Sequence, residues 1–214
     1  MSTSYELIYF QIHGRAEPIR LLLTLAGQPF TDTVLTREQW KSAKATMPLF
    51  QLPVLVEKDA RGERRIPQSQ AILRHLARTF RFDGADEEQR VRADVVAETC
   101  VDIAAGIGAL LHGAGKGNAE LADKYWNETW KTNLAKLGNL LASAPAGADG
   151  LFVAATPTYA DVNAFQLLHT HLAMRPACLD GAPELRRFHD RMAALPQWQS
   201  YLGTRRKSEA TVPG

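Results

Sequence analysis

Tyr9 is the residue near the start of the sequence whose type and position best suit chemistry on a ligand. It lies toward the end of Glu6–Phe10, a short run of aromatic and aliphatic residues typical of a strand buried on both faces. A side chain there can point past the sheet edge into a cleft. A neutral phenol has a reference pKa of about 10, so it can donate a hydrogen bond to an anion near pH 7. Periodicity alone favours instead a strand aromatic whose hydroxyl bonds the backbone, and Tyr5 is the rival donor.

The pair Gln68 and Ser69 marks a second place for ligand chemistry, because it opens a predicted helix. Ser69 is expected at the N-cap, ahead of an apolar face with helical spacing. The free amides and the positive dipole end of a helix attract a carboxylate. Ser69 can also serve only as the cap of its own helix, and the two roles are compatible.

Metal and dithiol redox chemistry are not predicted. Four histidines invite a metal interpretation: His13, His112, His169 and His171. No pair of them has ligand spacing with a carboxylate or thiolate nearby. The two cysteines, Cys100 and Cys178, lie far apart and belong to no CxxC pair, so we expect neither a disulfide scaffold nor a zinc site.

The composition is that of an ordinary globular protein, with 45% hydrophobic and 22% charged residues among 214 positions. The net charge of +2 is too small to indicate nucleic acid or an anionic membrane surface as a partner. No run of about 18 apolar residues and no secretory signal pattern occurs, so we expect no membrane association and a reducing cytoplasmic location.

Strand and helix patterns alternate over the first part of the chain. After the strand with Tyr9, Pro18 lies in the first turn of a predicted helix, and Gly27 ends that helix. Phe30–Val34 is typical of a second strand.

A polar segment with Trp40 and Lys44 follows and is expected to be irregular. Pro53–Glu57 and Arg64–Ile66 then flank Asp59–Gly62, which is the pattern of a β-hairpin with glycine at the turn. With the helix after Ser69, these elements predict a small α/β domain of βαβ–ββα order over residues 1–82.

Only helical patterns follow the linker Phe82–Ala85. The predicted helices span residues 87–112, 120–143, 159–172, 184–194 and 197–204. Thr158 and Asp161 have the spacing of a capping box, which is a folding device. We therefore predict an all-α C-terminal domain over residues 86–214.

Four motifs resemble the cytosolic glutathione transferase superfamily, and with the domain order they extend over nearly the whole chain. The segment Tyr9–Arg20 is similar to the first strand, turn and helix of the classes that use a catalytic tyrosine: sigma, pi, mu and alpha. The other motifs are Gln51–Pro53, Gln68–Ser69 with Ile72–Leu76, and Thr158–Asp161. Each is weak alone, but four in the family's order are specific, and the set looks closest to sigma or pi. The resemblance implies a thioredoxin-like fold for the N-terminal domain.

The resemblance implies that Tyr9 stabilises the thiolate of glutathione, which serves as co-substrate without any permanently bound cofactor. A free cysteine-type thiol titrates at about 8.5, so most of it is protonated at pH 7. Lowering that pKa by ~2 units requires about 2.7 kcal/mol, and one charge-assisted hydrogen bond of roughly 1.5–3 kcal/mol can supply it. Arg15 is implied to reinforce the thiolate field or to hold the loop, and a surface salt bridge is its alternative role.

In the family the peptide bond before the proline matching Pro53 is cis. This bond turns the backbone of Leu52 outward, where it pairs with the cysteinyl residue of glutathione like an added strand. Gln51 is implied to help hold the peptide. The alternative is an ordinary trans proline at the start of a strand.

The two carboxylates of glutathione also have implied partners. Gln68 and Ser69 match the pair that grips the γ-glutamyl carboxylate, while the Trp40 indole and the Lys44 ammonium match the partners of the glycine carboxylate.

Asp102 matches the helix acid that reaches into the partner subunit's site and pairs with the γ-glutamyl ammonium. The resemblance therefore implies a homodimer. Asp94 and Glu98, one turn apart on the same helix, are competing candidates, and a solvated carboxylate is the alternative. Leu49-Phe50 departs from the family's pattern of an aromatic residue and a glycine before the glutamine. The resemblance therefore does not define the dimer contact around these two residues.

Ile12, His13 and His112 match positions that line the second-substrate pocket. The implied activity is transfer of glutathione to small hydrophobic electrophiles, as in detoxification. An isomerase or peroxidase using the same activated glutathione is one alternative. A non-catalytic binding or structural protein of the same fold is another.

Overall fold

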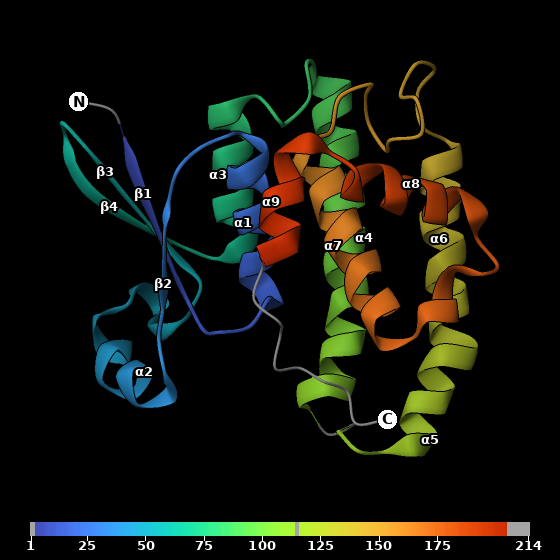
Figure 1. Ribbon diagram of the computed structural model, residues 1–214, viewed down its shortest axis with the longest axis horizontal. Helices are drawn as coiled ribbons and strands as arrows, with labels where there is room; N and C mark the ends of the chain where they lie inside the picture. The colour runs from blue at the N-terminus through green and yellow to red at the C-terminus, as the bar shows by residue number, and fades with distance from the viewer. Residues whose placement is uncertain (1–2, 114–115, 205–214) are drawn as a thin grey trace. The chain divides into compact units, whose positions relative to one another are not determined.

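The computed structural model describes residues 3–113 and 116–204, which form two compact units (Figure 1). The first unit holds residues 3–82 together with 196–204, and the second holds 83–113 and 116–195. The last described segment of the chain thus belongs to the same unit as the first.

The first unit is built on a four-stranded mixed sheet with the order β2–β1–β3–β4. The strands are β1 (Ser4–Tyr9), β2 (Thr31–Val34), β3 (Val54–Asp59) and β4 (Gly62–Pro67). β1 is parallel to β2 and antiparallel to β3, and β3 forms an antiparallel hairpin with β4. This sheet confirms the predicted α/β class of the N-terminal part, with strand ends within one or two residues of the predicted ones.

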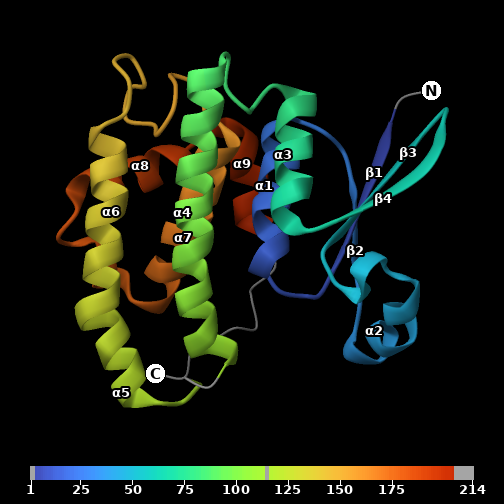
Figure 2. The ribbon, with the colours of Figure 1, turned by 180° about the vertical axis from the view of Figure 1, so that it is seen from behind.

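Helices α1 (Glu17–Leu25) and α3 (Ser69–Phe80) lie side by side on the same side of the sheet (Figures 1 and 2). Helix α9 (Pro196–Thr204) packs on α1. Its Trp198 is completely buried, and the indole N–H donates to the carbonyl of Leu21 at 2.9 Å. Burying an indole while satisfying its N–H is strongly favourable, so α9 is fixed to α1 by packing and by a specific hydrogen bond.

The prediction of an irregular segment around Trp40 is wrong, because residues Arg37–Ala43 form helix α2. No residue of α2 is buried, so its sequence has no apolar stripe from which the helix could be predicted. The helix is initiated locally by a capping box. The Gln39 amide donates to Thr36 Oγ1 at 3.2 Å, and the Thr36 amide donates to Gln39 Oε1 at 2.8 Å.

Ser69, the predicted N-cap of α3, is instead its first helical residue. Gln68 takes the N-cap position, with φ of 73° and no side-chain cap. The chain passes from the end of β4 at Pro67 into α3 within one residue, and the positive φ of Gln68 makes that turn.

The described part of the second unit is mostly helical, which confirms the predicted class of the C-terminal part. Its α-helices are α4 (Glu87–His112), α5 (Ala119–Lys124), α6 (Trp130–Ala142), α7 (Tyr159–Met174) and α8 (Pro183–Ala193). The single helix predicted over 120–143 is instead α5 and α6 joined by a π-helical turn, Tyr125–Thr129. Among the described residues, no helix has the length and apolar character needed to span a membrane.

Two polar side chains, one buried and one half-buried, hold the loops of this unit. Asp161 is completely buried and accepts hydrogen bonds from the amides of Phe152 and Thr158, both at 2.8 Å, and from Thr158 Oγ1 at 2.7 Å. This confirms the predicted capping box and shows that it also ties down the preceding loop. Arg92 of α4 donates to the carbonyls of Phe152 at 2.6 Å and Leu140 at 2.5 Å.

His171 is completely buried in an aromatic cluster formed around the π turn. The ring stacks on Trp130, with centroids 3.9 Å apart. A carbonyl can only accept, so Nδ1–H donates to Leu167 O at 2.7 Å, and Nε2 accepts from the Tyr125 hydroxyl at 2.7 Å. Burial lowers the pKa of His171 to about 4, although the bond to Leu167 acts in the opposite direction.

This histidine makes stability depend on pH. Between its unfolded pKa of 6.5 and its folded pKa of about 4, the unfolded chain binds a proton that the folded chain lacks. The free energy of unfolding should therefore fall as pH drops through this window, by up to roughly 3 kcal/mol. Urea unfolding at several pH values should show that His171→Gln loses this component. Equal pH slopes for the variant and the parent would contradict it.

Candidate functional site

Tyr9 ends β1 with its side chain 6% exposed. Its hydroxyl oxygen accepts a hydrogen bond from the backbone amide of Arg15 at 3.2 Å. The hydroxyl thus does contact the backbone, but as an acceptor. Among the residues that the structure describes, no acceptor is in place for the phenol proton, so that proton remains available to a ligand.

The turn between β1 and α1 brings its backbone against the Tyr9 ring. Gly14 has φ of +43°, and a Cβ built on it would lie 2.7 Å from the Tyr9 hydroxyl oxygen. Glycine is therefore required here both by the backbone conformation and by the close approach. The next residue, Arg15, acts on Tyr9 through its amide, while its exposed side chain makes no hydrogen bond or ion pair with described residues.

Pairing register places the ends of three strands at one edge of the sheet. Ile8 of β1 pairs with Val54 of β3, and Val54 pairs with Pro67 of β4. The residues immediately beyond these are therefore neighbours at this edge: Tyr9, Pro53 and Gln68. Residues that were predicted from separate sequence motifs therefore lie together at this edge.

The peptide bond between Leu52 and Pro53 is cis, as the family resemblance implied. Just before it, the Gln51 side-chain oxygen accepts a hydrogen bond from the Gln68 side-chain amide at 3.4 Å. The structure therefore brings Gln51 and Gln68 together, from segments 17 positions apart. Ser69 begins the 12-residue helix α3, and the first backbone amides of a helix have no intrahelical carbonyl partner.

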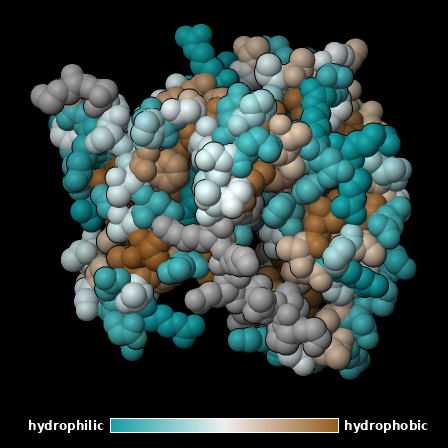
Figure 3. Space-filling view, viewed as in Figure 1, coloured by the Kyte–Doolittle hydropathy of each residue, from teal (hydrophilic) through white to brown (hydrophobic). Residues whose placement is uncertain are grey.

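Trp40 and Lys44 come from α2 and the turn after it. The Trp40 ring lies edge-on to Phe10, with centroids 5.8 Å apart, and packs with Leu52 on the small apolar cluster around Ile8. Lys44 is exposed. Figure 3 shows a brown, hydrophobic area at the lower left, in the region that β2 and α2 occupy in Figure 1.

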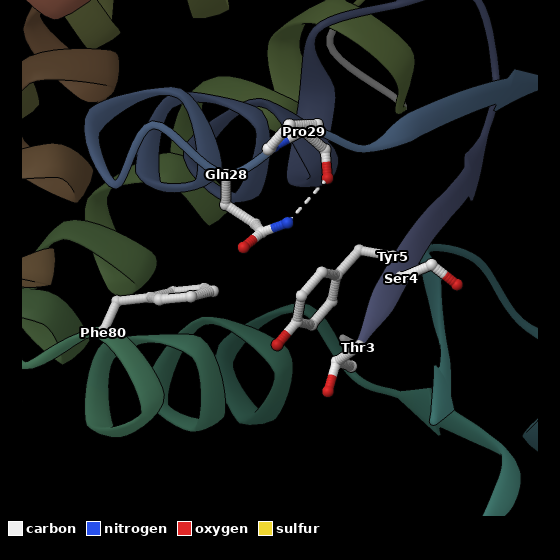
Figure 4. Close-up of a pocket in the computed structure, with 6 residues that line it drawn as sticks. All are labelled: Thr3, Ser4, Tyr5, Gln28, Pro29 and Phe80. Atoms are coloured by element: carbon white, nitrogen blue, oxygen red, sulfur yellow. Dashed lines mark hydrogen bonds between the residues drawn. The ribbon is translucent and has the colours of Figure 1, made fainter. Parts of the chain in front are cut away.

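Tyr5, the rival donor, lies at the opposite end of β1. Its ring centroid is 5.8 Å from that of Phe80. Both residues line a hollow of about 540 Å³ together with Gln28 and Pro29, and Figure 4 shows how these side chains lie. Burial raises the pKa of the Tyr5 hydroxyl, and Glu57 adds to the effect. None of the predicted site residues lines this hollow.

The remaining predicted residues of the first unit, Ile12 and His13, lie in the turn after β1 and are half-buried. In the second unit, Asp102 is exposed on α4. Its competitor Asp94 accepts a hydrogen bond from the Tyr159 hydroxyl, so that carboxylate already has a structural partner. His112 ends α4, and its side chain lies outside the described part of the structure.

No metal-binding group of three or more His, Cys, Asp or Glu side chains occurs among the described residues. Burial raises the pKa of Cys178 to about 11 and raises the pKa of the Cys100 thiol still further, so both make poor nucleophiles.

Sequence reasoning assigned no role to Gly14 or Arg20. A glycine in the turn after Tyr9 was a usable signal, whereas the partners of Arg20 are visible only in the fold.

Comparison with known proteins agrees with this geometry. A family model described as "Glutathione S-transferase, C-terminal domain" matches residues 101–205. The chain is 33% identical over 209 residues to "Glutathione S-transferase P" of Caenorhabditis elegans, covering 98% of this chain and 97% of that protein.

Solved structures agree as well. The pi-class glutathione S-transferase of Onchocerca volvulus superposes with a TM-score of 0.87 at 34% identity, covering 99% of this chain and 98% of the other. A glutathione S-transferase of the hookworm Necator americanus, described as monomeric, has a TM-score of 0.85 at 26% identity and covers 96% of this chain and 99% of its own. The chain therefore belongs to the glutathione transferase family of enzymes.

Proposed function

We propose that Tyr9 holds glutathione as its thiolate for transfer to small hydrophobic electrophiles. The observation that carries this proposal is the hydrogen bond from the Arg15 amide to the Tyr9 hydroxyl oxygen. It fixes the phenol and leaves its proton for the sulfur. Hydrogen bonds in a chain strengthen one another, so accepting from Arg15 makes Tyr9 a better donor. Arg15 thus supports catalysis through its backbone.

The rest of glutathione extends along the same sheet edge. The backbone of Leu52, before the cis Pro53, pairs with the cysteinyl residue like an added strand, with Gln51 beside it. Gln68, Ser69 and the N-terminus of α3 hold the γ-glutamyl carboxylate. At the opposite end of glutathione, Trp40 and Lys44 donate hydrogen bonds to the glycine carboxylate. The electrophile lies beside the thiolate against Ile12 and His13. The cytoplasm is the expected compartment for such detoxification, because glutathione is kept reduced there.

Tyr9→Phe should remove the donor to the thiolate and leave the other glutathione contacts intact. Turnover should fall by about 10²–10³, the loss typical of one oxyanion donor. Affinity for S-methylglutathione, which has no ionisable thiol, should change little. Turnover is measured with an aryl halide, an isothiocyanate and a hydroperoxide, so that conjugation and peroxidase activity are separated. Tyr5→Phe, at the other end of β1, is the matched control and should keep full activity.

If Tyr9→Phe turned over within a factor of two of the parent, Tyr9 would not be the thiolate donor. If the parent bound glutathione but reacted with none of the three acceptors, the non-catalytic alternative would be favoured.

Gly14→Ala should damage the same contact from the loop side. A Cβ there would collide with the Tyr9 hydroxyl oxygen at 2.7 Å. We expect turnover to fall at least about tenfold, because a displaced catalytic group loses its alignment. Gly27→Ala is the control, since Gly27 also has positive φ, at +63°, but a Cβ added there would meet no atom within 4 Å. Both variants should lose roughly 1–2 kcal/mol of stability to backbone strain. Equal turnover in the two would show that the Gly14 contact with Tyr9 is unimportant.

The site also borrows Asp102 from a second copy of the chain. Asp102 lies exposed on α4, a helix that also exposes two large apolar side chains, Val91 at 53% and Val95 at 50%. Exposed valines on one helix suit burial in a symmetric dimer. The monomeric hookworm relative shows that the fold does not require dimerisation.

Asp102→Asn should raise the Michaelis constant for glutathione roughly five- to thirty-fold, because the γ-glutamyl ammonium loses its anionic partner. Glu98→Gln, one turn earlier, is the control and should leave the constant unchanged. Sedimentation should show dimers for both variants. A fully active monomer, or an unchanged Michaelis constant in Asp102→Asn, would refute the shared site.

A further inference from the structure

Arg20 of α1 is a buried arginine that no part of the proposed chemistry uses. Its side chain is 4% exposed. Nε and Nη2 donate to the two carboxylate oxygens of Asp32, at 3.1 and 3.3 Å. This is the two-point geometry that a planar guanidinium forms with a carboxylate, and it fixes the orientation of the whole group.

The remaining nitrogen, Nη1, faces the turn that follows β1. It donates to the carbonyl of Ile12 at 3.1 Å and contacts the carbonyl of His13 at 3.4 Å. It also donates to the Glu17 carboxylate at 3.1 Å. Arg20 therefore holds two consecutive carbonyls of the turn from the inside.

The same turn presents the Arg15 amide to Tyr9. Only Gly14 separates the carbonyls held by Arg20 from that amide, and the amide meets the Tyr9 hydroxyl at 3.2 Å. The two rigid peptide planes meet at Gly14, so fixing the first restricts where the second can lie. The guanidinium carbon also lies 5.9 Å from the centroid of the Tyr9 ring, within the range of a cation–π contact.

The network extends to the last described helix of the chain. Glu17 is completely buried, and its second oxygen accepts from the Tyr201 hydroxyl of α9 at 2.8 Å. A buried carboxylate needs such partners, and the arginine it holds needs a fixed carboxylate. The link runs from Tyr201 through Glu17 and Arg20 to the turn, entirely within the first unit.

We propose that Arg20 is a positioning residue for the thiolate donor, and that Tyr201 of α9 completes it. Arg20 holds the turn so that the Arg15 amide stays on the Tyr9 oxygen, and the Tyr9 proton stays directed at the glutathione sulfur. This inference rests on the proposed function of Tyr9. Lysine cannot substitute, because a single ammonium cannot make the fork to Asp32 and reach the turn at once.

The test is Arg20→Lys, which keeps the positive charge between Asp32 and Glu17. The pKa of the bound glutathione thiol is read from the ultraviolet absorbance of the thiolate as pH is varied. We expect that pKa to rise by about 0.5–1 unit, which is a three- to tenfold loss of thiolate well below the pKa. The dissociation constant for S-methylglutathione should change less than about twofold, because the peptide contacts remain.

Arg92→Lys is the matched control. Arg92 is a second arginine that holds backbone carbonyls, those of Phe152 and Leu140, but it does so in the other unit. Both substitutions should lower the melting temperature, and only Arg20→Lys should move the thiol pKa. An equal shift in both variants would reduce the role of Arg20 to general stability and overturn the proposal.

Combination with Tyr9→Phe decides whether Arg20 acts through Tyr9. In the Tyr9→Phe background, adding Arg20→Lys should leave the thiol pKa unchanged. A further shift of the same size would overturn the proposal, because Arg20 would then act on the sulfur directly. If Tyr9→Phe raises the pKa but Arg20→Lys does not, only this inference fails. If Tyr9→Phe itself leaves the pKa unchanged, the proposed function fails and this inference fails with it.

Tyr201→Phe provides a milder variant if Arg20→Lys does not fold. It removes one oxygen at a partly buried position and leaves both carboxylates paired with Arg20. We expect the thiol pKa to rise in the same direction by a smaller amount, about 0.3 unit, with Tyr9→Phe again abolishing the change. An unchanged pKa in Tyr201→Phe would contradict the role of α9 and, without a folded Arg20 variant, the proposal as a whole.

Discussion

The Arg15 amide donates to the Tyr9 hydroxyl oxygen, and the rest of the proposed site depends on this contact. A phenol has one proton to give, and its direction is set by what the oxygen already accepts. With a backbone donor in place, the proton is left for an incoming anion. The contact exists because Gly14 lets the turn approach the ring, and a side chain at that position would occupy the space.

The sheet register then determines what else is within reach of a ligand. Because β1, β3 and β4 end in step, Tyr9 shares an edge with the cis peptide before Pro53 and with the turn at Gln68. Here that edge is the surface on which a small peptide with two carboxylates could bind, with a helix N-terminus beside it.

Much of the first unit could be predicted from sequence, since strands and α1 show apolar patterns and the hairpin has its glycine. Helix α2 was missed because it buries no residue and so shows no apolar pattern, although the spacing of Thr36 and Gln39 was a readable capping-box signal. The N-cap at Gln68 escaped prediction because a positive φ at a non-glycine residue has no sequence signature. The hydrogen bond between Tyr201 and Glu17 could not be predicted either, because these residues are 184 positions apart in the sequence. The family resemblance implied roles for Tyr9 and Arg15, but none for Gly14, Arg20 or Tyr201.

The most direct test of this account is a structure of the complex with glutathione. The account predicts the sulfur within hydrogen-bonding distance of the Tyr9 hydroxyl, with the Arg15 amide still on the Tyr9 oxygen. A sulfur held by another donor, or a Tyr9 hydroxyl turned away toward the backbone, would contradict it.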